Sequence, residues 1–230
     1  DETNSESPGF DDLTLKNYHM PVSLTIGQSK EEEVEQFITE NRMHKGVGTD
    51  LAFRCLNEMT DDATTLKARK SGIYKDVDFV KSAYPVVDIM NQRKDSQFND
   101  RLRKPNIKPK AAPNATISEK GFADGINPLM GTSNSPMYYD SSADIAEVLI
   151  KWWNAWEEIC PKPFQRGIGQ NPNDFVIQQN IGTQSLNKLL SKLPQLGLSI
   201  KKLSKDEFVS LIDIDDLRDP TNWMKGMGKW

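Results

Sequence analysis

Proline and glycine recur throughout residues 104–137, and this stretch most limits how the chain can fold. Proline occurs at positions 105, 109, 113, 128 and 136 and glycine at 121, 125 and 131, with Ser, Thr and Asn between them. These residue types interrupt helices and favour turns, so no helical period is expected in this range. Because a loop of this length is uncommon inside one compact domain, the pattern predicts a linker between two modules.

Apolar residues repeat with helical spacing on both sides of this stretch. The clearest helix is predicted over 141–160, where the apolar positions follow the 3.6-residue period: Ile145, Val148, Leu149, Trp152, Trp156 and Ile159. Ser29 with Glu32, and Ser204 with Glu207, have the spacing of capping boxes and predict two further helix starts. Pro85 is expected in the first turn of a separate helix.

The predicted fold is therefore mainly α, with two small helical modules joined by a long Pro/Gly-containing linker and with extended N- and C-terminal arms. The predicted ranges are 1–28 for an acidic arm and extended segment, 29–103 for the N-terminal helical module, 104–137 for the linker, 138–213 for the C-terminal helical module and 214–230 for a Trp-containing tail. Residues 1–17 hold few apolar side chains to offset the entropy of ordering, which predicts a mobile arm.

Charge is distributed unevenly along the chain, although the net charge is only −4. Residues 1–62 carry 14 acidic and 5 basic side chains, a balance of −9, whereas residues 63–120 carry 6 acidic and 13 basic side chains, a balance of +7. The remaining residues, 121–230, carry 13 acidic and 11 basic side chains, a balance of −2. The central excess of positive charge points to a negatively charged partner.

Seven basic residues within an 18-residue span form the best candidate binding segment, here called the basic strip: Arg93, Lys94, Arg101, Arg103, Lys104, Lys108 and Lys110. An extended basic segment can follow a phosphate backbone, because neutralising phosphates releases counterions and needs no fixed geometry. Phe98 is in a position to stack on a base. The alternative interpretation is a solvated helix end followed by a soluble linker, with Asp95 and Asp100 diluting the charge.

Tryptophans supply a second candidate surface for binding a protein partner. Trp153 lies about 100° round the predicted helix from Trp152, outside the apolar stripe. An out-of-phase Trp is typical of a contact surface, and the alternative is a helix buried on two sides. In the tail, Trp223 and Trp230 are expected to anchor on neighbouring subunits.

Catalytic and metal-binding motifs are not found in the sequence. The only histidines are His19 and His44, and neither lies near a cysteine in a pattern typical of nucleophilic catalysis or zinc binding. Gly46-Val-Gly48 lacks the remainder of a dinucleotide-binding fingerprint. We therefore expect no enzymatic activity, no cofactor, no metal site and no small-molecule substrate.

The cellular setting follows from the cysteines and from the lack of long apolar runs. Cys55 and Cys160 lie far apart and are interpreted as reduced thiols, with a disulfide as the alternative. No apolar run approaches the ~20 residues of a membrane span, and the acidic N-terminus does not resemble a signal peptide. These features predict an intracellular (cytoplasmic) or virion protein that is neither secreted nor in the membrane.

Together these features favour a non-enzymatic structural or assembly protein that binds a polyanion, most plausibly RNA. The general plan of helical core, arms and basic strip is that of a viral coat or nucleocapsid subunit, by analogy of architecture. Such a protein is expected to be a homo-oligomer that associates through its terminal arms. The alternative hypothesis is an intracellular adaptor or regulatory module that binds protein partners through the 141–160 helix.

Overall fold

A computed structural model describes residues 77–105, 107–165 and 171–226, together with 26–29, 32, 33, 36, 51 and 54. Between residues 77 and 226, the described chain is mainly helical. Its α-helices are α5 (Val77–Gln92), α6 (Glu119–Met130), α7 (Ser142–Ile159), α8 (Asn180–Lys192), α9 (Lys205–Ile212) and α10 (Asp215–Arg218). The strands are β1 (Leu102–Arg103) and β2 (Ile117–Ser118), and the short 3-10 helices are η1 (Pro109–Ala111), η2 (Lys162–Phe164), η3 (Pro172–Asp174), η4 (Leu193–Leu196) and η5 (Pro220–Trp223).

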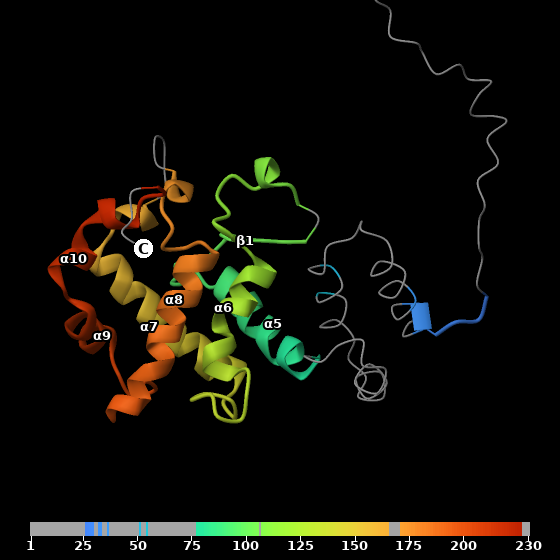
Figure 1. Ribbon diagram of the computed structural model, residues 1–230. Coiled ribbons are helices and arrows are strands. Elements are labelled where there is room, and N and C mark those ends of the chain that lie inside the picture. Colours follow the sequence, from blue (N-terminus) through green and yellow to red (C-terminus); the bar gives the residue numbers. More distant parts are fainter. Residues whose placement is uncertain are drawn as a thin grey trace, which may run out of the picture.

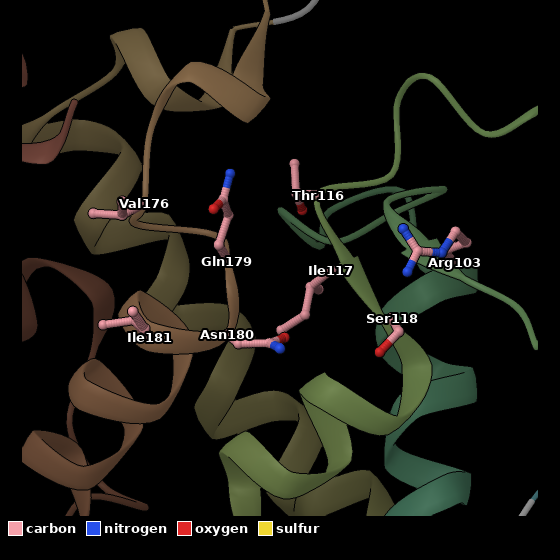
Figure 2. A pocket seen from close by; sticks show the side chains of 8 residues that line it. All are labelled: Arg103, Thr116, Ile117, Ser118, Val176, Gln179, Asn180 and Ile181. Carbon is pink, nitrogen blue, oxygen red and sulfur yellow. The ribbon is translucent and has the colours of Figure 1, made fainter. Parts of the chain in front are cut away.

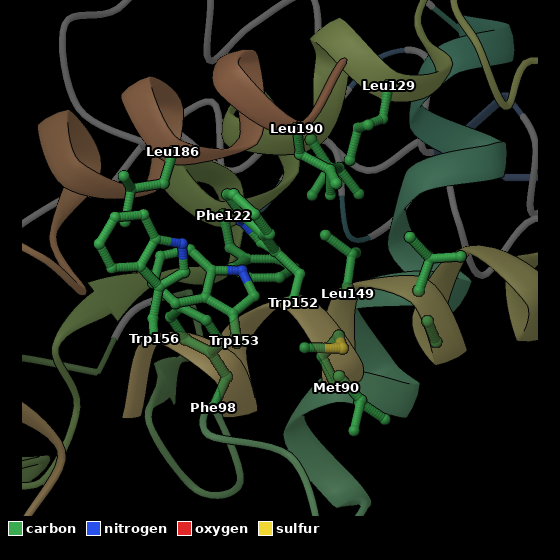
Figure 3. Packing of buried hydrophobic residues seen from close by; sticks show 14 of the residues in the cluster. Met90, Phe98, Phe122, Leu129, Leu149, Trp152, Trp153, Trp156, Leu186 and Leu190 are labelled. Atoms are coloured by element: carbon green, nitrogen blue, oxygen red, sulfur yellow. The ribbon is translucent and has the colours of Figure 1, made fainter. Parts of the chain in front are cut away.

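Helix α7 lies at the centre of the helical assembly (Figure 1). It packs against α5 and α9, while α6 packs along α8 and also against α5. The side chains between these helices form one hydrophobic core, in which Trp152, Trp153 and Trp156 of α7 gather with Phe98 and Phe122 (Figure 3). The core therefore connects elements from residue 80 to residue 223.

The predicted helix starts are confirmed by their capping hydrogen bonds. Ser204 and Glu207 make a complete capping box at α9, and the Ser141 side chain accepts a hydrogen bond from the Asp144 N–H, 3.1 Å away, at α7. The Ser29 and Glu32 capping box is present as well, with the Ser29 N–H donating to Glu32 Oε2 at 2.9 Å. In each case a side-chain oxygen satisfies an N–H that the first helical turn leaves without a partner.

Helix α6 corrects the prediction for residues 104–137, because it lies inside the predicted linker and is largely buried. Ser118 caps it, accepting a hydrogen bond from the Gly121 N–H at 3.0 Å. Its glycines serve close packing instead of ending the helix: a Cβ at Gly125 would lie 2.8 Å from Cγ2 of Thr183 on α8. Pro128 is accommodated within the helix. The sequence pattern predicts that Gly121 and Gly125 interrupt helices, whereas in the structure they form the surface of α6 on which α8 packs.

Helix α5 also departs from the predicted two-module organisation. It packs on α6 and α7, so residues 77–103 and 138–213 share one core instead of lying on either side of a spacer. Pro85, expected to start a separate helix, lies inside a continuous α5. The neighbouring Val86 and Val87 are fully buried, so tertiary packing offsets the backbone hydrogen bond that proline removes. Most of the predicted acidic arm and much of the range 29–76 lie outside the described residues.

Gly182 in the first turn of α8 offers a test of this packing. A Cβ at this position would overlap the backbone carbonyl oxygens of Val176 and Ile177, which cannot rotate away as a side chain can. We expect Gly182→Ala to lower the free energy of unfolding by about 2 kcal/mol, as overpacking commonly does. Ser185→Ala, at an exposed position of the same helix, is the matched control and should change it by less than about 0.5 kcal/mol. Urea denaturation followed by circular dichroism measures both, and equal stabilities would contradict the expected clash.

Candidate polyanion-binding surface

A two-stranded parallel sheet positions the middle of the basic strip. In its register Leu102 pairs with Ile117 and Arg103 pairs with Ser118. Leu102 and Ile117 are buried, whereas Arg103 and Ser118 are half-buried, so the sheet turns one pair to the core and the other outward. The Thr116 N–H donates to the Arg101 carbonyl at 3.0 Å and extends this pairing by one residue.

Arg101 is not available to a polyanion, which corrects its assignment to the binding site. Its side chain is only 1% exposed. The guanidinium donates hydrogen bonds to Gln178 Oε1 and to the Phe164 carbonyl oxygen. Arg101 comes just before β1, and Phe164 and Gln178 hold its buried guanidinium. Its role in the described structure is to tie Phe164 and Gln178 to the residue that precedes β1.

Arg93 is half-buried and is engaged by the chain's own carboxylates. Its Nε donates to Asp95 Oδ1 at 2.9 Å, and its guanidinium also pairs with Glu147 on α7. The hydrogen bonds from Arg93 hold the pKa of the Asp95 carboxyl below its ordinary value. A phosphate approaching Arg93 would compete with two negative charges, so this residue is a weak member of the strip.

Five members of the basic strip remain accessible, and none has an ion pair or side-chain hydrogen bond with another described residue: Lys94, Arg103, Lys104, Lys108 and Lys110. Lys94, Lys104, Lys108 and Lys110 are exposed, and Arg103 is half-buried. Figure 1 shows that η1, between β1 and β2, lies away from the helical body. The structure therefore reduces the candidate strip from seven residues to five.

Lys94 and Lys104 line one hollow of about 410 Å³ beside the end of α5, here called the α5 hollow. Its wall also includes Arg54 and Asp88, whose side chains form an ion pair at 2.7 Å. Asp100 contributes a further carboxylate, and amides come from Asn91, Gln92 and Asn99. With three basic and two acidic residues in its lining, the α5 hollow has a small positive excess.

A second hollow, of about 370 Å³, lies where β2 meets the start of α8 and is called the β2–α8 hollow (Figure 2). Eight residues line it: Arg103, Thr116, Ile117, Ser118, Val176, Gln179, Asn180 and Ile181. No acidic residue is among them. Of these residues only Arg103 was predicted: residues 116–118 fell in the predicted linker, and residues 176–181 lie too far along the chain to be associated with Arg103 from sequence. The alternating polar and apolar residues of Thr116-Ile117-Ser118 before Glu119 are the signal that indicates a strand and a helix cap here.

The proposed partner-binding tryptophans are not presented to a partner, which is a second correction. Trp153 is completely buried, and its ring lies 4.8 Å from that of Phe98, edge to face. Helix α7 packs against α5 and α9, and Trp153 contacts the rings of Phe98 and Phe164 instead of solvent. Trp223 is 5% exposed and packs 5.5 Å from Trp156 of the same chain. Trp230 lies outside the described residues.

The remaining predictions about chemistry are tested only in part. Cys160 is a free, buried thiol as expected, and burial raises its pKa to about 11, whereas Cys55 lies outside the described residues. The described part of the chain contains no group of three or more His, Cys, Asp or Glu side chains arranged to hold a metal ion. Within that part, no helix combines the length and apolar character needed to cross a bilayer.

Comparison with known proteins identifies no relative: no protein-family model, curated protein or solved structure matches the chain.

Proposed function

We propose that this chain is a non-enzymatic assembly protein that binds a polyanion, specifically RNA, through the accessible part of its basic strip. The observation that carries the proposal is the state of five basic side chains: Lys94, Arg103, Lys104, Lys108 and Lys110 are accessible and have no acidic partner among the described residues. Exposed lysines and arginines that are not neutralised within the protein attract phosphates and release their counterions.

The adaptor hypothesis relied on an exposed Trp153, and this side chain is buried in the core, which favours the polyanion proposal. The proposed protein is of viral coat or nucleocapsid type, in which copies of one chain assemble along a nucleic acid. In this proposal self-association uses the N-terminal arm at 1–28, since Trp223 packs within its own chain. The setting that we propose is a virion or the cytoplasm in which it assembles.

RNA binding is expected to depend strongly on salt. The logarithm of the affinity should fall with the logarithm of the salt concentration with a slope of about −0.7 for each phosphate contacted. Fluorescence anisotropy with a labelled single-stranded RNA, measured at several KCl concentrations, gives this slope. The triple variant Lys94→Gln, Lys104→Gln and Lys108→Gln should bind more weakly and show a slope smaller by up to about 2.

A matched control separates the basic strip from net charge. Lys188, Lys192 and Lys202 are exposed lysines of the C-terminal half, and replacing them with Gln removes the same charge. This control variant should retain most of the affinity and of the salt dependence. Light scattering after size-exclusion chromatography tests assembly in the same samples. A chain that stays monomeric and shows no salt-dependent RNA binding would contradict the proposal.

A further inference from the structure

The β2–α8 hollow lies where two helices begin side by side. Helix α6 starts after Ser118, and α8 starts after Gln179. Gly121 brings these starts together, because Asn180 Oδ1 occupies the space that a Cβ on this glycine would take. Both helices exceed ten residues, and N–H groups of a first turn carry partial positive charge. No side chain among the described residues caps α8, so these groups can receive an anion.

Thr116 supplies an independent indication that the hollow holds a ligand. Its side chain is 8% exposed, and its hydroxyl oxygen has no hydrogen-bond partner among the described residues. Figure 2 shows Thr116 at the start of β2, where it lines the hollow together with Gln179. A buried hydroxyl without a partner is costly, and a ligand oxygen placed in the hollow would provide one.

Arg103 provides the positive charge of the same hollow. It lies beside Ser118 in the β1–β2 register, on the outward face of the sheet. A guanidinium can donate two parallel hydrogen bonds to a phosphate, which a lysine cannot. Glu119, the acidic residue of the first turn of α6, is buried and does not line the hollow. Among the described residues, the lining therefore has one positive charge and no negative charge.

The other side of the hollow is apolar. Ile117, Val176 and Ile181 contribute to the wall, and Ile181 is 70% exposed at its mouth. The volume of about 370 Å³ is within the range of small-molecule sites and exceeds what a single phosphate fills. An apolar wall beside a group of donors matches a ligand that carries both an anion and a flat ring.

We propose that the β2–α8 hollow binds one nucleotide, with its phosphate at Arg103, Thr116 and the α8 N-terminus and its base against the exposed Ile181. This site goes beyond the polyanion-binding strip, because it recognises one phosphate with its attached nucleoside through fixed geometry. The nucleotide has two possible sources, a free mononucleotide or one residue of an RNA chain, and both present the same phosphate chemistry.

Isothermal titration calorimetry of the full chain with uridine 5′-monophosphate, uridine and inorganic phosphate tests this site. The monophosphate should bind at least about tenfold more tightly than uridine, because charge-assisted hydrogen bonds are lost with the phosphate. Arg103→Gln should weaken binding of the monophosphate about tenfold, and Thr116→Val about fivefold. Thr116→Val should leave the melting temperature unchanged or raised, since the hydroxyl has no partner in the described protein. This readout separates loss of a ligand contact from loss of structure.

Competition identifies the source of the nucleotide. Displacement of a labelled oligouridine by the monophosphate shows that the site takes a residue of RNA, and binding without displacement shows that it takes the free nucleotide. The triple Lys→Gln variant at 94, 104 and 108 should lose affinity for RNA and keep affinity for the monophosphate. Failure of the RNA-binding proposal can therefore be distinguished from failure of the nucleotide-binding proposal. Equal binding of uridine and its monophosphate, no binding of either anion, or wild-type binding by both Arg103→Gln and Thr116→Val would overturn the proposal.

Discussion

Replacing Trp153 with Ala is expected to lower the free energy of unfolding by about 3–5 kcal/mol, the usual cost of removing a large aromatic side chain from a core. The indole is fully buried and packs edge to face on Phe98, with Phe164 on another side. Its removal would leave a cavity lined by α7, by Phe98 in the segment that follows α5, and by Phe164 in η2. Densely packed cores collapse only partly around such a cavity.

Urea denaturation monitored by circular dichroism measures this loss. Leu196→Ala is the control, because Leu196 is 74% exposed and its truncation should cost less than about 0.5 kcal/mol. If Trp153 were instead a contact for another protein, its replacement would leave stability nearly unchanged and reduce partner binding. That pattern would contradict the described core.

Replacing Arg101 with Met is expected to cost about 3 kcal/mol of stability. The substitution preserves much of the side chain's length but leaves Gln178 Oε1 and the Phe164 carbonyl without the donors that they face in a buried setting. The segment that carries these acceptors should detach more readily from the β1–β2 sheet. Hydrogen exchange of the amides between 171 and 180 reports this loosening directly.

Lys104→Met is the matched comparison for Arg101, since it removes a positive charge three residues away on the exposed surface. It should change stability by less than about 0.5 kcal/mol and weaken RNA binding. The opposite pattern, with a stable Arg101→Met variant that has lost RNA affinity, would restore Arg101 to the binding strip.

Features that depend on local chemistry were predicted correctly from the sequence. The capping boxes at Ser29 and Ser204 and the helix over 141–160 follow from hydrogen bonds and spacing within a few residues. Helix α6 was not predicted, because glycine and proline were weighed by their intrinsic helix propensity. What stabilises α6 is the close packing of Gly121 and Gly125 against α8, which lies about 60 residues later in the chain. No local sequence pattern reveals that contact.

The candidate site was predicted only in part, because it too depends on contacts between residues that are far apart in the sequence. Sequence identifies which residues are basic, but burial and pairing depend on what the rest of the chain places beside them. Glu147 lies 54 positions from Arg93, and Gln178 lies 77 positions from Arg101, so neither partner was visible from the strip itself. The hollow beside Arg103 is likewise formed by residues 103, 116–118, 176 and 179–181, which meet only in the folded chain.

Residues 223–225, near the end of the described chain, are held to the rest of the protein by backbone hydrogen bonds and by ring packing. The Val176 N–H donates to the Trp223 carbonyl at 2.7 Å, the Lys225 N–H donates to the Asp174 carbonyl at 2.9 Å, and Trp223 covers Trp156. Shortening the chain before Trp223 would expose an indole and leave two backbone groups unsatisfied, next to the wall of the β2–α8 hollow that Val176 provides. Truncations made to probe assembly should accordingly keep residues up to 226, or a folding defect will be mistaken for failed association.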